Sequence, residues 1–254
     1  YFASLRRITM NKIAIIIPSR LDAKRLPNKP LKLINDKEMI LHVYNAAASS
    51  KAGEVYVATP DQKIVDIVKN AGGNVVKTSD KHETGTDRIF EVFKNNLDKI
   101  PNIIINLQGD MPNIKPQAIS KLVSYMKEEK CDIGTLASEL SSKEEIENSN
   151  VVKVAVEGKL SNNLFLNALD FFRKDENSQG NLYHHIGIYA FTKKALIRYV
   201  DLKRTKLELK RKLEQLRALE NNMSIHVGYV DASPLSVDTE EDLIEVKKIM
   251  ENKK

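Results

Sequence analysis

The chain has 254 residues, of which 42% are hydrophobic, enough for one large α/β domain or two small ones. Its 40 Lys and Arg residues exceed its 34 Asp and Glu residues, and the net charge of +6 is as typical of Lys-rich helical surfaces as of nucleic-acid binding. The single Cys131 excludes an internal disulfide, and no Cys/His cluster indicates zinc.

No apolar stretch approaches the ~18 residues that a membrane helix needs. Residues 1–11 are predicted to be an N-terminal extension, too short and too polar for a secretory signal. We therefore expect a protein of the cytoplasm that does not insert into a membrane. Nucleic-acid binding is the least favoured function class, because aromatic residues are only 6% and form no stacking pattern along a strand.

Strands and helices alternate through the first half of the chain. The predicted strands are 13–17, 54–58, 74–77 and 102–107, and the predicted helices are 37–50, 61–71, 86–97 and 116–129. This alternation is typical of a mainly parallel sheet that has helices on both faces and right-handed crossovers.

The second half has a different pattern. Strands are predicted at 132–137, 151–156, 185–191 and 225–229, helices at 205–221 and 239–250, and an irregular segment at 162–179. Because no linker, repeat or Pro/Gly-rich hinge divides the chain, we expect one domain over residues 12–252 with an inserted or appended subregion.

A cluster of basic residues follows the first predicted strand. Arg20, Lys24, Arg25 and Lys29 come directly after Pro18, at the carboxyl end of that strand. Open α/β sheets bind their ligands at this edge, and cations so close together repel one another unless an anion joins them. The loop therefore favours a polyphosphate site, and an ordinary solvated basic loop is the alternative.

Two acidic residues are candidates for holding Mg²⁺. Asp110 follows strand 102–107 and a permissive Gly109, and Asp238 precedes the last helix. Mg²⁺ takes one or two carboxylates and completes its shell with water and phosphate oxygens. A turn residue at position 110 and a helix cap at position 238 are the alternatives, and spacing in the sequence does not decide between them.

Two weaker patterns remain. Gly85, flanked by Thr84 and Thr86, offers backbone N–H groups at a helix start to a phosphate or a base edge, although an ordinary helix cap explains it too. His185 and Tyr189 share one face of a strand, but no third partner completes a nucleophile triad, so the sequence does not support covalent catalysis.

Six motifs occur in series from about residue 12 to residue 248. They read Ile-Pro-Ser-Arg…Arg-Leu-Pro-x-Lys-Pro-Leu, His-x-Thr-Gly-Thr-Asp-Arg, Asn-x-Gln-Gly-Asp, His-x-Gly-Ile-Tyr, Leu-Glu-Gln-Leu-Arg and Val-Asp-Thr-x-Glu-Asp-Leu. In this series the chain closely resembles the 3-deoxy-manno-octulosonate (KDO) cytidylyltransferases, also called CMP-KDO synthetases.

The resemblance implies the reaction CTP + KDO → CMP-KDO + pyrophosphate, which serves lipopolysaccharide synthesis. It also implies a nucleotide-diphospho-sugar-transferase-like (Rossmann-like) α/β fold, a Mg²⁺ cofactor, a cytoplasmic location, and a homodimer in which about residues 155–205 contribute a dimerisation subregion.

The resemblance also assigns roles residue by residue. It places Arg20, Arg25 and Lys29 on the triphosphate, and Thr84, Gly85, Thr86 and Arg88 around the cytidine. It places Asp110 and Asp238 on the metal. The residues that it places in the sugar-acid pocket are Gln108, His185, Tyr189, Glu214 and Gln215. Arg20, Lys29 and the two aspartates carry the catalytic role.

Four positions depart from the family pattern. Met111 replaces a usual Glu, Leu166 and Asn167 replace a usual Ser-Arg, and Arg211 stands where a Glu is common. Loss of a guanidinium from an anion site predicts weaker sugar-acid binding. A related sugar acid as substrate (an amino-KDO or a sialic acid) and a CTP-binding homologue with impaired turnover are therefore the alternatives.

Overall fold

The computed structural model describes residues 12–22, 25–95, 101–128, 130–162, 164–174 and 179–251. The predicted extension at 1–11, Lys24 and the last residues of the predicted helices 86–97 and 116–129 lie outside the described residues.

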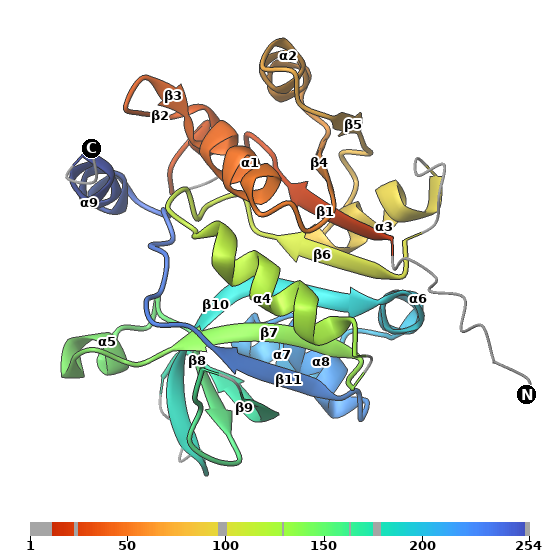
Figure 1. Cartoon of the computed structure of the whole chain (residues 1–254), viewed down its shortest axis with the longest axis vertical. Coiled ribbons are helices and arrows are strands. Elements are labelled where there is room, and N and C mark those ends of the chain that lie inside the picture. The colour runs from red at the N-terminus through yellow and green to blue at the C-terminus, as the bar shows by residue number, and fades with distance from the viewer. Residues whose placement is uncertain are drawn as a thin grey trace, which may run out of the picture.

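One mixed sheet forms the centre of the protein, with the strand order β5-β4-β1-β6-β10-β7-β11-β9-β8 (Figure 1). Its strands are β1 (Ile13–Pro18), β4 (Glu54–Thr59), β5 (Val75–Lys77), β6 (Ile103–Leu107), β7 (Ile133–Ser138), β8 (Lys153–Val156), β9 (Phe165–Phe172), β10 (Asn181–Thr192) and β11 (Ile225–Tyr229). A separate hairpin joins β2 (Leu33–Ile34) to β3 (Lys37–Glu38).

The helices are the 3-10 turn η1 (Lys29–Leu31) and α1 (Met39–Ser49), α2 (Gln62–Asn70), α3 (Gly85–Asn95), α4 (Pro116–Met126), α5 (Lys143–Glu147), α6 (Lys193–Asp201), α7 (Lys206–Arg211), α8 (Gln215–Glu220) and α9 (Glu240–Glu251). Within the described part of the chain, no helix combines the length and apolar character needed to span a bilayer.

The two halves of the sheet differ in strand direction. Strands β5, β4, β1 and β6 pair in parallel, as the alternating pattern predicts, whereas β10 pairs antiparallel with both β6 and β7. The start of β10 also pairs with β8, so β10, β7, β11, β9 and β8 close into a small ring of strands. The predicted α/β class is confirmed, with a sheet that is mixed rather than parallel throughout.

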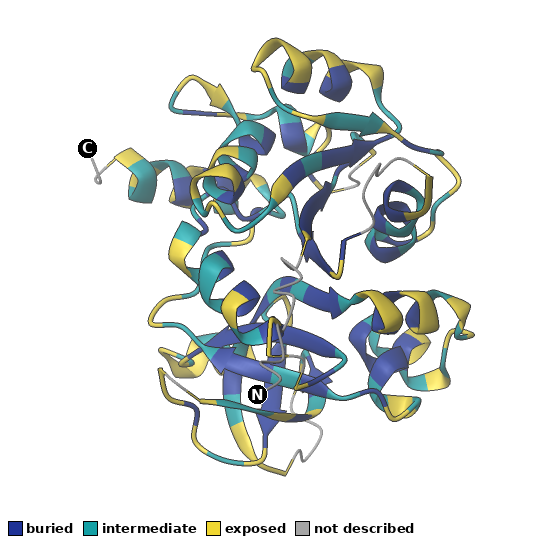
Figure 2. Ribbon diagram, turned by 45° about the vertical axis from the view of Figure 1, so that its right-hand side comes forward, coloured by how far each residue is buried: buried dark blue, intermediate teal, exposed yellow. Residues whose placement is uncertain are grey.

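The buried strands supply both faces of the core. In β1, Ala14 and Ile16 point to one hydrophobic cluster, and Ile13, Ile15 and Ile17 point to the other, because successive side chains leave a strand on opposite faces. Helices α1 and α4 cover the face turned to the viewer in Figure 1, and α3 and α6 pack on the other. Figure 2 shows the resulting buried centre and exposed helical surfaces.

Two predictions for the second half are wrong. The segment 162–179 was expected to be irregular, but it contains β9, which pairs with β8 and β11 and buries Ala168 and Phe171. The helix expected over 205–221 is two helices, because Lys212 adopts a left-handed conformation (φ 55°, ψ 47°) between α7 and α8.

Three elements of the second half were not predicted or were predicted only in part. Strand β10 extends well beyond the predicted 185–191 and leads directly into α6, whose first turn is capped by Thr192 accepting a hydrogen bond from the Ala195 N–H. A short helix, α5, lies in a stretch expected to be a loop, and Ser142 caps it in the same way.

Candidate active site

The basic loop after β1 is anchored to the neighbouring strand β4. The N–H of Ser19 donates to the carbonyl of Ala58 at 2.9 Å, and the N–H of Leu21 donates to Asp61 Oδ2 at 2.8 Å. The loop ends in η1, which begins at Lys29 after Asn28 in a left-handed conformation (φ 56°). These contacts hold the cations of the loop at the carboxyl edge of the sheet.

Asp110 and Asp238 meet at this edge although they are far apart in the sequence. The N–H of Val237 donates to the carbonyl of Asp110 at 2.9 Å, which brings the approach to α9 beside the end of β6. Lys29 Nζ lies 3.1 Å from Asp110 Oδ2 and 3.1 Å from Asp238 Oδ1, so these two oxygens are at most twice that distance apart. Arg25 Nη2 contacts the other oxygen of Asp238 at 2.9 Å.

The capping of α9 leaves the Asp238 carboxylate free for this arrangement. Asp242 Oδ2 accepts from the N–H groups of Asp238 and Thr239 at 2.9 and 2.8 Å, and Thr239 Oγ1 accepts from the Asp242 N–H at 3.2 Å. Thr239 and Asp242 therefore cap the helix, and the predicted alternative, a cap made by the Asp238 side chain, is wrong.

Lys29 is a charged group held between two acids. Burial lowers the pKa of its ammonium, but the charges of Asp110 and Asp238 and their hydrogen bonds outweigh burial, so the pKa of Lys29 is raised. The lysine is therefore firmly protonated, and the acidic pair is matched to a cation between its oxygens.

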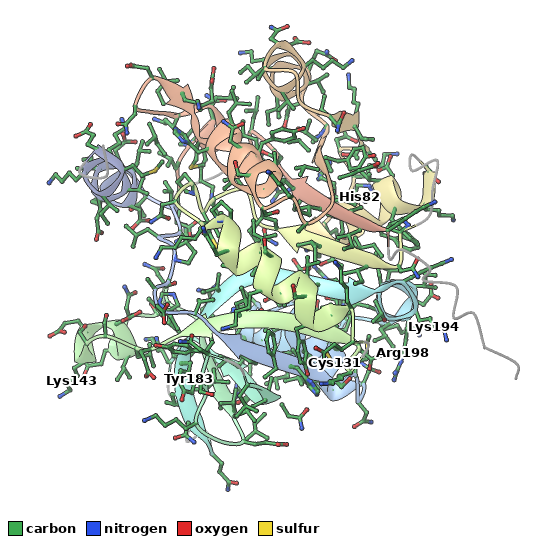
Figure 3. All side chains as sticks on the ribbon, viewed as in Figure 1. His82, Cys131, Lys143, Tyr183, Lys194 and Arg198 are labelled. Atoms are coloured by element: carbon green, nitrogen blue, oxygen red, sulfur yellow. The ribbon has the colours of Figure 1, made fainter. Side chains whose placement is uncertain are left out.

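A cavity of about 440 Å³ opens beside this cluster. The predicted site residues that line it are Arg20, Arg25, Lys29, Thr84, Gly85, Arg88, Gln108, Asp110, Glu214 and Asp238. Ser19 and His82, which stand in two of the six motifs but were assigned no role from the sequence, line it as well. His82 precedes α3 and pairs with Glu91 on that helix (Figure 3).

The segment before α3 forms one wall of this first cavity. Thr84 caps the helix, accepting from the Asp87 N–H at 3.1 Å, and a Cβ on Gly85 would lie 3.3 Å from Pro18 Cγ. Arg88 is buried and donates to Thr78 Oγ1 at 2.6 Å and to the Ser79 carbonyl at 2.8 Å. Burial, with the charge of Arg20, lowers the pKa of Arg88.

A second cavity of about 280 Å³ adjoins the first. The predicted sugar-acid residues all line it, namely Gln108, His185, Tyr189, Glu214 and Gln215. Four residues line both cavities: Gln108, Asp110, Glu214 and Asp238. A ligand group in one cavity can therefore approach a ligand group in the other directly across the two aspartates.

Hydrogen bonds link the residues on the wall between the cavities. Gln108 Nε2 donates to Asn106 Oδ1 at 3.2 Å, Asn106 Nδ2 donates to Thr86 Oγ1 at 3.3 Å, and Thr86 Oγ1 donates to Glu214 Oε2 at 2.9 Å. Thr86, predicted beside the cytidine, thus lines the second cavity. Burial raises the pKa of Glu214, although the bond from Thr86 acts in the opposite direction.

His185 is a neutral wall of the second cavity. Burial lowers its pKa to about 3, and its ring meets the edge of Phe171 at 5.1 Å between centroids. Thr135 Oγ1 lies 3.0 Å from His185 Nε2 and 2.7 Å from the Ile188 carbonyl. Because a hydroxyl carries one proton, Thr135 donates to Ile188 and accepts from a protonated Nε2. Burial also raises the pKa of Tyr189, whose phenol keeps its proton.

The four departures from the family pattern have different places in the structure. Met111 is buried and lines the second cavity. Leu166 packs against the hydrophobic core from β9, and Asn167 is exposed and donates to Glu157 Oε1 at 3.0 Å. Arg211 Nη1 pairs with Asp170 Oδ1 at 2.6 Å and donates to the Phe171 carbonyl at 3.0 Å, which ties α7 to β9.

Two cations that the sequence did not single out line the second cavity. Arg173 follows β9 and donates to the carbonyls of Ser149 and Asn150 at 3.3 and 3.0 Å, and Lys212 is the left-handed residue between α7 and α8. Lys212 directly precedes the Leu-Glu-Gln-Leu-Arg motif, which was a usable signal. Arg173 had none, because β9 itself was not predicted.

Comparison with known proteins shows which family the chain resembles. A family model described as cytidylyltransferase matches residues 14–225. The chain is 43% identical to the 3-deoxy-manno-octulosonate cytidylyltransferase of Rhodopseudomonas palustris (strain BisB18) over 245 residues, which cover 96% of this chain and 99% of that protein. A relative of the same name from Brucella canis is 43% identical over 91% of this chain and 93% of its own length.

Solved structures of cytidylyltransferases also match the chain. The chain superimposes on CMP:2-keto-3-deoxy-manno-octonic acid synthetase complexed with CTP with a TM-score of 0.85 at 34% identity, over 96% of this chain and 100% of that one. It also matches 4-diphosphocytidyl-2C-methyl-D-erythritol synthase from Anaerococcus prevotii with a TM-score of 0.63 at 15% identity, over 95% and 99% of the two chains, a likeness of fold alone.

Proposed function

The chain belongs to the family of 3-deoxy-manno-octulosonate cytidylyltransferases, and from that membership we propose that it transfers the cytidylyl group of CTP to KDO and releases pyrophosphate. The observation that carries the proposal is the pair of adjoining cavities with Gln108, Asp110, Glu214 and Asp238 on their shared wall. The first holds the nucleotide and the second holds the sugar acid.

The reaction needs positioning more than covalent help. The anomeric hydroxyl of KDO attacks the α-phosphorus of CTP and gives up its proton to solvent, while the bond from the α-phosphorus to the bridging oxygen breaks and pyrophosphate leaves in line. Cations that stabilise the charge building on the phosphate oxygens lower the barrier. Arg20, Arg25 and Lys29 line the first cavity and are the residues that we propose to bind the triphosphate and the leaving pyrophosphate.

We propose Mg²⁺ as the cofactor, held by Asp110 and Asp238. The two carboxylates fit such an ion because both already face one cation, Lys29 Nζ, at 3.1 Å. Mg²⁺ bound there would polarise the α-phosphate and lower the pKa of the attacking hydroxyl. With the carboxylates engaged by the ion, the Lys29 ammonium, which lines the same cavity, would be available to the phosphates of CTP.

The second cavity suits an anionic, hydroxyl-rich ligand. Arg173 and Lys212 supply positive charge for the KDO carboxylate, and Gln108, Tyr189 and Gln215 supply polar groups for its hydroxyls. The cavity therefore has cations for the substrate although the family arginine is replaced by Asn167, whose side chain is committed to Glu157.

Pyrophosphate release tests this function. The protein is incubated with CTP and Mg²⁺ alone and with each of KDO, an amino-KDO and a sialic acid. Release that depends on KDO is the expected result. Release with another acid only would reassign the substrate, and CTP binding without release with any acid would identify a non-catalytic homologue.

We further propose that the chain acts as a homodimer and supplies activated KDO for lipopolysaccharide synthesis. Leu164 and Leu169, in the subregion at 155–205, are 43% and 45% exposed, as apolar residues of an interface between copies would be in one isolated chain. Light scattering should give twice the chain mass for the wild type and a monomer for Leu169→Lys, and a wild-type monomer would refute the dimer.

A further inference from the structure

Ser19 carries a buried hydroxyl with no hydrogen bond. The residue is 7% exposed. Its Oγ is buried and has no hydrogen-bond partner, and in the described part of the chain no other buried side-chain N or O atom is in this state. Buried polar groups in native proteins are nearly always paired, because an unpaired one loses its bonds to water and gains nothing. Ser19 lines the first cavity, so the missing partner can be a ligand.

The rest of Ser19 is already committed to the fold. Its N–H donates to the Ala58 carbonyl at 2.9 Å, which attaches the residue to the end of β4. On one side, Pro18 packs against Gly85, where a Cβ would lie 3.3 Å from Pro18 Cγ. On another side, a Cβ on Gly109 would lie 3.3 Å from the Pro18 carbonyl. The backbone that carries the hydroxyl is therefore held where the segments after β1, before α3 and after β6 converge.

The charges nearby indicate which part of a nucleotide reaches this hydroxyl. The cations Arg20, Arg25 and Lys29 follow Ser19 along the loop, and Arg20 is exposed whereas Ser19 is buried. A triphosphate is attracted to the cations, which places its phosphates along the loop and its nucleoside toward the buried end. A neutral hydroxyl suits the neutral polar groups of a base or a ribose, as both donor and acceptor.

We propose that Ser19 Oγ binds the nucleoside of CTP, so that the nucleotide supplies the hydrogen bond that the fold leaves unmade. The inference rests on the proposed function, because it takes CTP as the ligand of the first cavity. Ser19 is thus a further binding residue of this site; it stands in the Ile-Pro-Ser-Arg motif, but the resemblance assigned it no role.

The Ser19→Ala variant should change stability and binding in opposite directions. Without ligand, its Tm should exceed that of the wild type, because the variant buries no unpaired hydroxyl. Its Kd for CTP and for CMP should rise roughly threefold to tenfold, the loss of one hydrogen bond. Its Kd for pyrophosphate should not change. Scanning fluorimetry gives the Tm, and isothermal titration calorimetry gives each Kd.

Two further variants make the result specific. Ser19→Cys keeps the shape of the side chain with a slightly larger atom that bonds weakly, so it should also weaken CTP and CMP binding. Ser138→Ala, the matched control, removes a buried hydroxyl that donates to the Glu139 carbonyl at 3.4 Å in β7, and it should lower the Tm and leave the Kd for CTP unchanged.

The possible failures are distinguishable. A wild-type protein that does not bind CTP would refute the proposed function. Wild-type binding with an unchanged Kd in Ser19→Ala would overturn the inference alone. So would a fall in the ligand-free Tm of that variant, or an equal weakening for pyrophosphate, because each would mean that the hydroxyl serves the fold or the phosphates instead.

Discussion

A buried ion pair behind the second cavity holds Glu214 in place. Arg217 Nε and Nη2 donate to Glu208 Oε2 and Oε1 at 2.9 and 2.6 Å, and each side chain is 4% exposed. The Arg217 guanidinium also lies 4.7 Å above the ring of Tyr199, whose hydroxyl donates to the Glu214 carbonyl at 3.0 Å. The pair thus links α7 and α8 to α6 and to the backbone of a residue that lines both cavities.

Replacing Arg217 by Met should be strongly destabilising. The Glu208 carboxylate would keep the Thr205 N–H at 3.2 Å and the half-exposed Arg204 at 3.6 Å, but it would lose its two short bonds. Removing one partner of a buried ion pair costs ~3–5 kcal/mol. In a domain of this size that corresponds to a fall in Tm on the order of 10 °C. Because Glu214 shifts as well, we expect the KM for the sugar acid to rise more than the KM for CTP.

A double-mutant cycle measures the pair itself. Glu208→Gln combined with Arg217→Met removes both charges, so the double variant should be more stable than the sum of the two single losses predicts. Differential scanning calorimetry of the four proteins gives the comparison. A free energy of unfolding of Arg217→Met within about 1 kcal/mol of the wild-type value, or losses that simply add, would refute the reasoning that a buried unpaired charge dominates.

Three shorter predictions concern single residues. Asp110→Asn should abolish pyrophosphate release, and near wild-type release at saturating Mg²⁺ would contradict a metal site on the two aspartates. His185 has a folded pKa of about 3, below its unfolded value, so its share of the stability is present above the unfolded pKa and is lost as the pH falls toward the folded one. The free energy of unfolding of His185→Asn, from urea titrations, should therefore fall less than that of the wild type between pH 7 and pH 5, by about 2 kcal/mol. Cys131 is buried near Lys194 (Figure 3), and burial raises its thiol pKa to about 12. A thiol reagent at pH 8 should label it only after unfolding, and rapid labelling of the native protein would contradict its burial.

Most of the first half of the fold was predictable because its longer elements have complete local patterns, although the β2–β3 hairpin was not predicted and its second strand lies within the predicted helix 37–50. Strand β1 is a run of β-branched residues that is buried on both faces, and α2 buries Ile64, Val65 and Val68 on one stripe. Strand β9 was missed because Asn167 and Asp170 interrupt its apolar alternation, and its partners β8 and β11 lie far away in the sequence. Lys212 gave no sign of a helix end, because a left-handed conformation usually requires Gly or Asn.

Local sequence patterns indicated most of the residues of the site, but they did not indicate which distant residues come into contact there. Residues at the ends of β1 and β6 had to share an edge of the sheet, which follows from parallel strands. That Asp238 joins them depends on the backbone bond from Val237 to Asp110, and this contact has no counterpart in local sequence. Only the resemblance to a family indicated that Asp110 and Asp238 belong to one site.

The position of Lys29 explains how an acidic pair and a polyphosphate can share one edge of the sheet. Without a cation, Asp110 and Asp238 would repel each other and would also repel CTP. Lys29 removes the first repulsion in this structure, since one ammonium contacts both carboxylates at 3.1 Å. A divalent ion can take over that neutralisation with a larger charge, and it can also bind phosphate oxygens. In the proposed complex with Mg²⁺ and CTP, the lysine would bind phosphate instead of carboxylate, so the side chain that neutralises the two aspartates in the free site would supply a cation to the bound nucleotide.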